Sequence, residues 1–207
     1  MDTMKKQVAG VILAAGRSSR MGRCKQLLPF GKFTILDTVI DNARHSELGE
    51  IILVLGHASD LILETSDFSG IRTVINIHHE KGQASSLVAG LEAVSGACMG
   101  VMFLLGDQPL VTTGIINRLI QAFETGTAPL IIPFCNGRRG NPVIFHRSLF
   151  HRLGSLTGDA GARVLFGELA SRTTRVDIPD PSILVDVDTP EDYEKLMGTC
   201  SANGGSQ

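Results

Sequence analysis

The sequence predicts an α/β fold in which a mostly parallel sheet is covered by helices on both faces. Strand-like runs alternate with helix-like stretches through the first half of the chain, and the strands are rich in Ile, Val and Leu on both faces. The chain has 207 residues, of which 43% are hydrophobic, and this is enough for one ample core. We therefore expect a single three-layer α/β/α domain over residues 1–200, with right-handed crossovers between parallel strands.

The predicted elements follow one another from the N-terminus in a β-α-β-α order. The first strand covers the apolar run VAGVILAA, which begins at Val8. Further strands are predicted at 51–55, 71–76 and 101–105, and helices at 35–45, 61–66, 85–94 and 115–123. Thr112 is the predicted N-cap of the last of these helices. Residues 201–207 are polar and rich in glycine, so we expect a disordered tail after the domain.

The composition argues against nucleic-acid and membrane partners. The net charge is −2, and nine Phe, one Tyr and no Trp are fewer rings than a platform for single strands needs. No apolar run approaches the roughly 18 to 20 residues of a membrane-spanning helix. The four cysteines are too widely spaced for a zinc site, which favours a reduced, cytoplasmic protein. They are Cys24, Cys98, Cys135 and Cys200.

The loop after the first strand, VILAAGRSSRMGRCKQLLPFG over residues 11–31, carries the strongest chemical signal. Gly16 allows the backbone to turn away from the strand, so the N–H groups that follow can form an anion-binding concavity. These N–H groups belong to Arg17, Ser18 and Ser19, and the cations of the loop are Arg17, Arg20, Arg23 and Lys25. Arginine forks bind phosphate oxygens in pairs and lysine acts as a point charge. The loop therefore predicts a triphosphate site.

Two better-known phosphate loops do not match this segment. A P-loop has four residues between its glycines and continues with Lys and then Ser or Thr. Here five residues separate Gly16 from Gly22, and Lys25 is followed by Gln26. No G-x-G-x-x-G motif opens the loop, as a dinucleotide-binding fold would require. A solvated basic turn is the alternative, and the close interleaving of glycines and cations argues against it.

The spacing L-A-A-G-x-S-x-R-M-G-x-x-K, over residues 13–25, resembles the signature loop of the nucleotidyltransferases that activate sugars, isoprenoid precursors and molybdopterin. Together with the segments described below, the chain is similar to the molybdenum cofactor cytidylyltransferase branch from residue 8 to residue 197. This resemblance implies a Rossmann-like nucleotidyltransferase fold in which Arg20 and Lys25 are catalytic. It also implies nucleotide binding by Leu13, Ala14, Ala15, Gly16, Arg17, Ser18, Ser19, Arg20 and Lys25.

A carboxylate is predicted at the tip of the strand at 101–105, where the sequence continues G-D-Q-P. Mg²⁺ prefers one or two carboxylates with phosphate oxygens and water, so one Asp beside a triphosphate is enough to begin a site. Asp107 could instead cap the next helix, but Thr112 is the better N-cap. The family that the chain resembles binds magnesium through the Asp of its L-x-D-Q-P segment. This implies Gly106 and Asp107 in the nucleotide site, Asp107 as a catalytic residue and metal ligand, and Mg²⁺ or Mn²⁺ as the cofactor.

A second acidic turn, V-D-V-D-T-P-E-D over residues 185–192, ends a short strand and opens a helix. By itself the turn fits an ordinary helix start, with Asp188 or Thr189 as the N-cap and Pro190 in the first turn. The family's D-x-D-T-P-E-D motif is similar, and it implies that Asp188 is the second metal ligand, with Asp186 as the less favoured choice.

The segment NIHHEKGQASSLVAGL, over residues 76–91, places polar side chains at a helix start, where anions and polar ligand edges bind. Gln83 offers both a donor and an acceptor, as recognition of a base edge requires. The family's similar G-Q-x-x-S-L segment lines the nucleotide pocket. The residues to which this gives a binding role are Asn76, Gly82, Gln83 and Ser86. The adjacent His78 and His79 are expected to be solvated.

Two further segments, NGRRGNPVIF over residues 136–145 and TGDAGARVLF over residues 157–166, resemble the acceptor side of the same branch. Their arginines could hold the phosphate or the pterin of an acceptor, and their glycines permit close approach of the backbone. Surface turns with solvated arginines are the alternative. The residues expected to bind the acceptor are Gln108, Arg138, Arg139, Gly140, Asn141, Asp159, Gly161 and Arg163.

These motifs together predict a nucleotidyltransferase that moves CMP from CTP, or a nucleotide from another NTP, onto the phosphate of a molybdopterin-type acceptor. A phosphate monoester has a second pKa of about 6, so it attacks without a general base. Cytidine follows from the resemblance, because this branch has L-A-A-G where guanylyl-transferring relatives have L-A-G-G, and Ala15 narrows the space for a purine. A molybdoenzyme that receives the product is a further expected partner.

Two other functions remain as alternatives. A sugar- or polyol-phosphate nucleotidyltransferase would keep the loop and both aspartates but change the acceptor segments. A non-catalytic maturation factor would bind finished molybdenum cofactor and deliver it to an enzyme. The intact Lys25, Asp107 and Asp188 disfavour the second of these.

Overall fold

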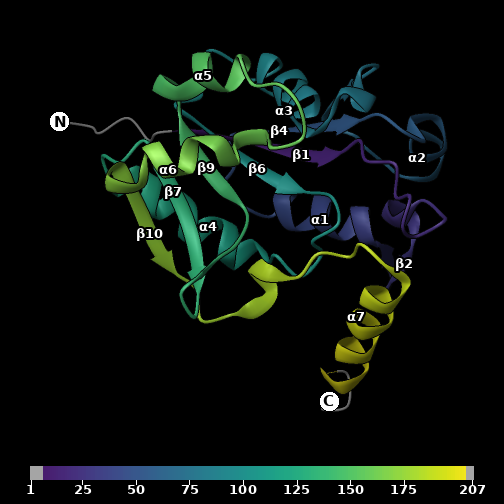
Figure 1. Cartoon of the computed structure of the whole chain (residues 1–207). Coiled ribbons are helices and arrows are strands. Elements are labelled where there is room, and N and C mark those ends of the chain that lie inside the picture. Colours follow the sequence, from purple (N-terminus) through teal and green to yellow (C-terminus); the bar gives the residue numbers. More distant parts are fainter. Residues whose placement is uncertain (1–6, 204–207) are drawn as a thin grey trace.

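The computed structural model describes residues 7–203, which form one eight-stranded sheet with helices on both faces (Figure 1). The strand order is β10-β7-β9-β6-β1-β4-β5, with β8 paired to β7. The strands of this sheet are β1 (Val8–Ala14), β4 (Glu50–Leu55), β5 (Arg72–Ile75), β6 (Gly100–Leu105), β7 (Leu130–Cys135), β8 (Arg138–Arg139), β9 (Val143–His146) and β10 (Thr173–Asp177). A separate antiparallel hairpin consists of β2 (Pro29–Phe30) and β3 (Phe33–Thr34).

Most of the strand pairs are parallel, so the predicted α/β fold is confirmed. The central strand β1 pairs in parallel with β4 and β6, β4 pairs in parallel with β5, and β7 does so with β10. Only β8 and β9, among the described strands of this sheet, pair antiparallel to their neighbours. Parallel pairing aligns the carboxyl ends of β1, β4 and β6, which is the edge where ligands bind in such sheets.

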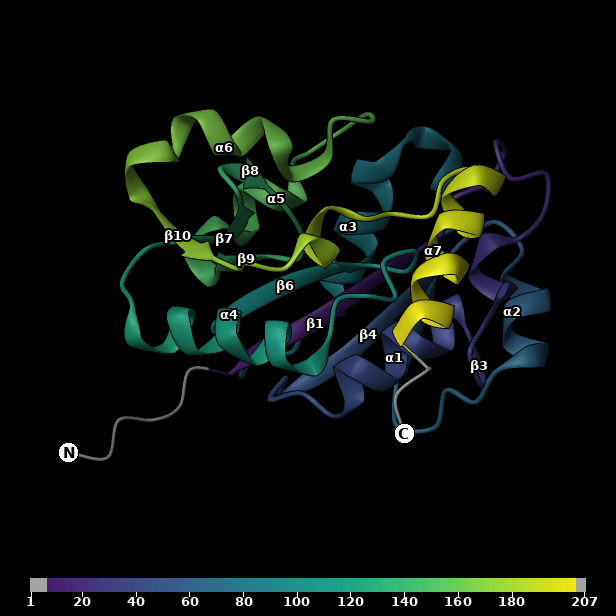
Figure 2. The ribbon, with the colours of Figure 1, turned by 90° about the horizontal axis from the view of Figure 1, so that it is seen from below.

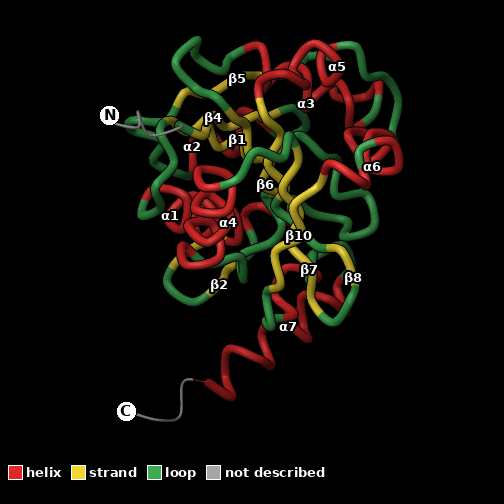
Figure 3. Tube along the Cα trace, turned by 90° about the vertical axis from the view of Figure 1, so that its left-hand side faces the viewer, coloured by secondary structure: helices red, strands yellow, loops and turns green. Residues whose placement is uncertain are grey.

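Helices cover both faces of the sheet, as Figure 3 shows. They are α1 (Ile35–Arg44), α2 (Ser59–Thr65), α3 (Gln83–Glu92), α4 (Thr113–Thr125), α5 (Phe150–Gly154), α6 (Leu165–Glu168) and α7 (Pro190–Asn203). Along β1 the side chains alternate between two cores: Val8 and Ile12 pack with α1 and α4, whereas Ala9 and Val11 pack with α3. Because both faces are buried, the strand reads as a continuous apolar run.

Each of the four helices predicted between residues 35 and 123 is present, and its ends lie within two residues of the expected ones. The N-cap prediction is confirmed, since the Thr112 side chain accepts a hydrogen bond from Ile115 N at 3.4 Å. Helix α1 begins with a capping box, in which Thr34 and Asp37 each bond the other's backbone N–H.

Helix α7 packs against two segments that are far apart in the sequence. The Tyr193 hydroxyl donates to Pro29 O at 2.8 Å, and Figure 2 shows α7 beside the β2-β3 hairpin. Leu196 packs with Met21 of the signature loop at residues 13–25, called the phosphate loop below, and with Val187 of the second acidic turn. The helix runs to Asn203, so residues 201–203 are helical and the tail predicted from residue 201 was wrong for them. No glycine or proline interrupts them before Gly204, and residues 204–207 lie outside the described residues.

None of the helices between residues 7 and 203 has both the length and the apolar character needed to cross a bilayer.

Candidate functional site

A cavity of about 550 Å³ opens at the carboxyl ends of β1 and β6. Its walls come from stretches that are far apart in the sequence. Leu13 and Gly16 lie at the end of β1, Gly106 and Asp107 follow β6, and the second acidic turn adds Asp188. This is the edge of the sheet where the phosphate loop and the two acidic turns were expected to meet.

The phosphate loop is folded back on itself by local hydrogen bonds. Ser18 has a φ of 51° and Gly22 a φ of 66°, both in the left-handed region. The Ser18 hydroxyl accepts from Lys25 N at 3.3 Å and donates to Gln26 Oε1 at 3.2 Å. Gln26 is 2% exposed and donates to Ala14 O at 3.4 Å. These bonds bring the end of the loop back against β1 and bury Lys25 at the base of the cavity.

Lys25 bridges the two predicted metal ligands. Its Nζ donates to Asp107 Oδ2 at 2.5 Å and to Asp188 Oδ1 at 2.7 Å, and the residue is only 8% exposed. Arg20 Nη2 donates to the other oxygen of Asp188 at 2.8 Å. Four residues from three distant parts of the chain therefore form one charged cluster.

The mutual charges of this cluster set its protonation. Burial alone would lower the pKa of Lys25, but Asp107 and Asp188 outweigh it and raise that pKa above its usual value. Burial raises the pKa of Asp107, and the nearby Asp186 and Asp188 raise it further against the opposing charge of Lys25. Burial would also raise the pKa of Asp188, yet its bonds to Lys25 and the charge of Arg20 hold it below the usual value. Lys25 is therefore a cation at neutral pH.

The donor set fits a hard divalent cation that arrives with phosphate. Asp107 Oδ1 is buried and has no hydrogen-bond partner within the described residues, which is a costly state for a carboxylate oxygen. Between residues 7 and 203, no three His, Cys, Asp or Glu side chains gather into a metal site by themselves. Two carboxylates leave most of an octahedral shell to phosphate and water, which suits Mg²⁺ or Mn²⁺.

The start of α3 forms the opposite wall. Gly82, with a φ of 99°, precedes the helix, and Gln83 and Ser86 face the cavity. Asn76 is 5% exposed, and its amide donates to Ser85 Oγ at 2.9 Å and Ser86 Oγ at 3.0 Å. Asn76 lies behind this wall, where it holds the helix start in place.

The structure adds four lining residues that the sequence analysis left out, which are Gln26, His79, Glu80 and Leu105. His79 and Glu80 line the cavity, and Glu80 forms an ion pair with Arg17 of the phosphate loop. His79 is packed against Gly56, where an added Cβ would lie 2.7 Å from the His79 Cβ. Because Ala15 and Gly56 are small, His79 can lie close to the end of β1. No local sequence pattern predicts such a contact.

The other predicted nucleotide-binding residues separate into two groups. Those that line the cavity are Leu13, Ala15, Gly16, Arg17, Arg20, Lys25, Gly82, Gln83, Ser86, Gly106 and Asp107. Those that do not line it, in the part of the chain that the structure describes, are Ala14, Ser18, Ser19 and Asn76. Asp186 lines it as well as Asp188.

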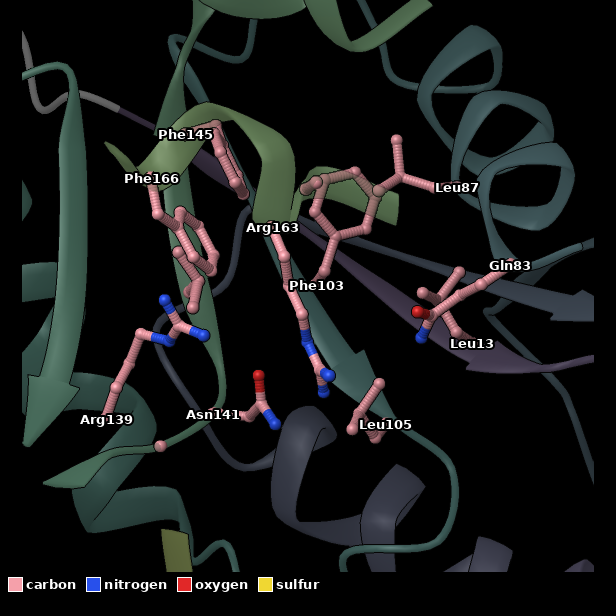
Figure 4. A pocket seen from close by; sticks show the side chains of 13 residues that line it. Leu13, Gln83, Leu87, Phe103, Leu105, Arg139, Asn141, Phe145, Arg163 and Phe166 are labelled. Carbon is pink, nitrogen blue, oxygen red and sulfur yellow. The ribbon is translucent and has the colours of Figure 1, made fainter. Parts of the chain in front are cut away.

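A second cavity, of about 110 Å³, adjoins the first (Figure 4). The predicted acceptor residues that line it are Arg139, Gly140, Asn141 and Arg163. The two cavities share four lining residues, which are Leu13, Gln83, Leu105 and Arg163. A ligand in one cavity therefore lies next to a ligand in the other.

Four of the predicted acceptor residues lie elsewhere. Arg138 and Arg139 are both exposed, but only Arg139 lines a cavity, because neighbouring residues of a strand point to opposite sides. Gln108 is 3% exposed and packs into the core beside Val111. Asp159 lines the first cavity instead of the second, and Gly161 packs beside the Gln83 side chain.

The comparison with protein families gives one match that covers most of the chain. The model of the MobA-like NTP transferase domain matches residues 10–173.

Three curated relatives are similar over nearly their whole length. Molybdenum cofactor cytidylyltransferase of Escherichia coli is 31% identical and covers 88% of this chain and 92% of its own. Nicotine blue oxidoreductase of Paenarthrobacter nicotinovorans is 29% identical, with coverage of 95% and 99%. Purine catabolism protein PucB of Bacillus subtilis is 31% identical, with coverage of 93% and 97%.

Solved structures agree with the fold. A homologue of the Mycobacterium tuberculosis protein Rv0371c, from Mycobacterium sp. strain JC1, has a TM-score of 0.84 and 31% identity, and covers 96% of this chain and 99% of its own. The Mycobacterium tuberculosis protein itself, solved in complex with manganese, has a TM-score of 0.76 and 30% identity, with coverage of 93% and 99%.

Proposed function

This chain belongs to the family of MobA-like NTP transferase domains, and we propose that it transfers CMP from CTP to the phosphate of molybdopterin or the molybdenum cofactor. The observation that carries the proposal is the cluster of Lys25, Asp107 and Asp188 in the larger cavity, which adjoins a second one. One cavity is large enough for a nucleoside triphosphate, and the second provides separate room for an acceptor.

The transfer is a single displacement at the α-phosphorus. An oxygen of the acceptor phosphate forms a bond to the α-phosphorus, the bond from this phosphorus to the α,β-bridging oxygen breaks, and pyrophosphate leaves with the electron pair. The acceptor phosphate is largely a dianion at neutral pH, because its second pKa is about 6, so the chain needs no general base. Its tasks are to align the two phosphates and to neutralise their charge.

Basic groups of the phosphate loop neutralise the triphosphate. Arg20 and Lys25 line the same cavity as the turn at Gly16, and they would hold the β- and γ-phosphates and the leaving pyrophosphate. Asp107 and Asp188 would hold Mg²⁺ or Mn²⁺, which screens phosphate charge and fixes phosphate orientation when it is bound. Asp186 is the less favoured second ligand.

The nucleotide base is assigned to the wall opposite the loop. Gln83 can donate to and accept from the edge of a cytosine, and Ser86 lies on the same helix face. Ala15 is 5% exposed and narrows this end of the cavity, which favours a pyrimidine over a purine. One methyl group discriminates by about 1–3 kcal/mol, so the preference for CTP over GTP is expected to be moderate.

The similarity to nicotine blue oxidoreductase supports one competing proposal, that the chain is an oxidoreductase, which would call for a redox cofactor such as a dinucleotide in the cavity. Two observations favour the transferase. The first loop has no G-x-G-x-x-G motif, and two carboxylates at the base of the cavity would repel a pyrophosphate unless a cation came with it.

The direct test follows pyrophosphate release by the whole chain with Mg²⁺, each of the four triphosphates and one of two acceptors, molybdopterin or a sugar 1-phosphate. Release with CTP and molybdopterin, and its loss in Lys25→Met, is the expected result. Release with the sugar phosphate alone would instead support the sugar-phosphate transferase. No release with any triphosphate, together with binding of finished molybdenum cofactor, would support the carrier. Oxidation of a reduced nicotinamide dinucleotide would support the oxidoreductase.

A further inference from the structure

The second acidic turn is fixed before Asp188 by its neighbour Val187. Val187 N donates to Asp107 O at 3.1 Å, which ties the turn to the end of β6. The Val187 side chain is fully buried in a cluster that it shares with the phosphate loop and α7. On either side of it in the sequence, Asp186 and Asp188 line the larger cavity. The direction of the Asp188 side chain therefore depends on how the chain continues into α7.

The continuation is a capping box made by Thr189 and Asp192. Asp192 N donates to the Thr189 hydroxyl at 3.2 Å. Asp192 Oδ2 in turn accepts from Thr189 N at 3.0 Å and from the Thr189 hydroxyl at 2.9 Å. Such a box gives partners to N–H groups that the first turn of a helix leaves without them. These three bonds alone describe an ordinary helix start.

A fourth bond of Asp192 reaches back to a residue of the charged cluster. Asp188 N donates to the same Asp192 Oδ2, at 3.4 Å. The two peptide planes that flank the Asp188 Cα are therefore anchored to one oxygen, which fixes the backbone from which the Asp188 side chain extends. Asp192 lines neither cavity, so it acts on the site through Asp188 and not by contact with a ligand.

The capping box of α1 has the same composition without the fourth bond. Asp37 N donates to the Thr34 hydroxyl at 3.1 Å, and Asp37 Oδ2 accepts from Thr34 N at 3.3 Å and from that hydroxyl at 2.7 Å. In the part of the chain that the structure describes, Asp37 makes no bond to the residue before Thr34, and neither member of this box lines a cavity. Of these two boxes, only that of α7 holds a residue of the site.

We propose that Asp192 is a positioning residue, which directs Asp188 toward Lys25 and Asp107 and thereby sets the affinity of the two carboxylates for a divalent cation. The inference rests on the proposed function, because Asp188 is a metal ligand in that proposal. Asp188 Oδ1 accepts from Lys25 at 2.7 Å, and its Oδ2 accepts from Arg20 at 2.8 Å. A rotation of the Asp188 backbone would displace both oxygens. Replacing a group that orients a metal ligand typically lowers metal affinity or activity by about 10- to 100-fold.

The position of Asp188 can be measured without turnover, as the affinity of the whole chain for Mn²⁺ in the absence of nucleotide. Electron paramagnetic resonance of the free ion follows the titration. Asp192→Ala should weaken Mn²⁺ binding about 10-fold. Asp192→Glu should recover most of this affinity, because a Glu at the same position also completes a capping box. Asp188→Asn is the reference for loss of the ligand itself, and it should weaken binding at least as much.

Two matched variants separate positioning from helix stability and from net charge. Asp37→Ala breaks the box of α1, so it should shift the urea midpoint about as far as Asp192→Ala does while the Mn²⁺ affinity stays unchanged. Glu191 is exposed, lies in the first turn of α7 and lines neither cavity. Glu191→Gln removes one negative charge beside Asp192, and it should change the Mn²⁺ affinity by less than about twofold.

Turnover with CTP and molybdopterin adds a second measurement. Asp192→Ala should lower kcat about 10-fold and leave KM for molybdopterin unchanged, because the change affects alignment at the metal and not acceptor binding. Unchanged Mn²⁺ affinity in Asp192→Ala, or a loss that Asp37→Ala or Glu191→Gln matches, would overturn the positioning role alone. No measurable Mn²⁺ binding by the unaltered chain, or equally tight binding by Asp188→Asn, would refute the proposed metal site, and the role of Asp192 with it.

Discussion

Lys25 reaches two carboxylates that lie 82 and 163 residues further along the chain, and its ammonium supplies the positive charge between them. A divalent cation held by Asp107 and Asp188 would bind carboxylate oxygens that Lys25 now contacts. Asp107 Oδ1 is different, because Lys25 does not contact it. The ammonium and the metal therefore compete until a triphosphate offers Lys25 other partners. Metal and nucleotide binding should consequently reinforce each other.

Lys25→Met is expected to separate the two roles of this side chain. Without a competing cation, the chain should bind Mn²⁺ in the absence of nucleotide at least about 10-fold more tightly, as followed by electron paramagnetic resonance of the free ion. Turnover should fall at least about 100-fold, because the charge of the leaving pyrophosphate is no longer neutralised. Lys25→Arg keeps the charge and should bind Mn²⁺ as weakly as the unaltered chain. Unchanged Mn²⁺ affinity in Lys25→Met would contradict the competition.

Ala15→Gly tests the assignment of the base. Removing the methyl group widens the end of the cavity near His79, so kcat/KM for GTP should rise relative to that for CTP by about 10-fold. The ratio of the two kcat/KM values, with the same acceptor, is the measurement. A ratio that does not move would show that Ala15 has no part in the choice of base.

The residues of the charged cluster could be predicted because each lies in a recognisable motif. The short strand expected before the second acidic turn was wrong, since residues 181–184 form a 3-10 helical turn. Lys25, Asp107 and Asp188 come from motifs at strand ends or helix starts, and parallel pairing brings such ends together. The prediction that Asn76 and Gln108 line the cavities was wrong, and for a different reason. Whether a polar side chain in a turn faces the cavity or the core depends on the exact rotation of that turn, and one residue of difference reverses the direction.

At the level of elements, the strands and helices of the first half were predictable and those of the second half were largely not. Strands β4 and β6 are largely apolar runs that alternate with helices. The edge strand β10 reads T-T-R-V-D and exposes alternate residues, and α6 has only four residues. Such short or polar segments have no periodicity of their own, and contacts with β7 and with the phenylalanine rings determine their structure.

Gly82 lies at the start of α3 and packs against the turn at Gly158. Gly82→Ala should disrupt this contact. An added Cβ would lie 2.6 Å from Gly158 C, while Ala84 N donates to Gly158 O at 3.1 Å. We expect a loss of about 3 kcal/mol in unfolding free energy, from left-handed strain and backbone overlap together, and weaker CTP binding. Gly70→Ala is the control, because Gly70 has a φ of 76° with open space around it, and strain alone should cost about 1 kcal/mol. Equal losses of unfolding free energy in Gly82→Ala and Gly70→Ala, measured by urea unfolding, would contradict a specific contact between Gly82 and the turn at Gly158.

Glu50 links the turn before β6 to the start of β4 through hydrogen bonds. Its contribution to the free energy of unfolding should depend on pH. Its Oε1 accepts from Ser95 N at 2.7 Å and from Cys98 Sγ at 3.2 Å. Burial opposes ionisation, yet these bonds and the charge of Arg72 hold the pKa of Glu50 below its usual value. A carboxyl whose pKa is lower in the folded chain stabilises it above the unfolded pKa of about 4.3, and this stabilisation disappears as the pH falls through the folded value.

Glu50→Gln should therefore lower the unfolding free energy by about 1 kcal/mol at pH 7, because a charged acceptor becomes a neutral one. The gap between the variant and the unaltered chain should close in acid. Urea unfolding of both chains across the pH range measures this gap, and a gap that stays constant would contradict the role of the ionised carboxylate.

On the scale of the whole molecule, the sheet divides the site between the two halves of the chain. The parallel strands β1 and β6 present the phosphate loop and Asp107, and later segments of the chain add Asp188 and Arg163. Helix α7 packs against the phosphate loop and the second acidic turn together, so the two halves are held in one geometry. Adjoining cavities predict that nucleotide and acceptor are bound at the same time.

Transfer of a nucleotidyl group by this site can be tested by following the two ends of the triphosphate separately. CTP labelled at the α-phosphorus and CTP labelled at the γ-phosphorus are each incubated with the chain, Mg²⁺ and molybdopterin. We expect the α-label on the molybdopterin product and the γ-label in pyrophosphate, and we expect both fractions to be lost in Lys25→Met. A γ-label on the acceptor, or an α-label that never leaves the nucleotide with any of the four triphosphates, would contradict such a transfer.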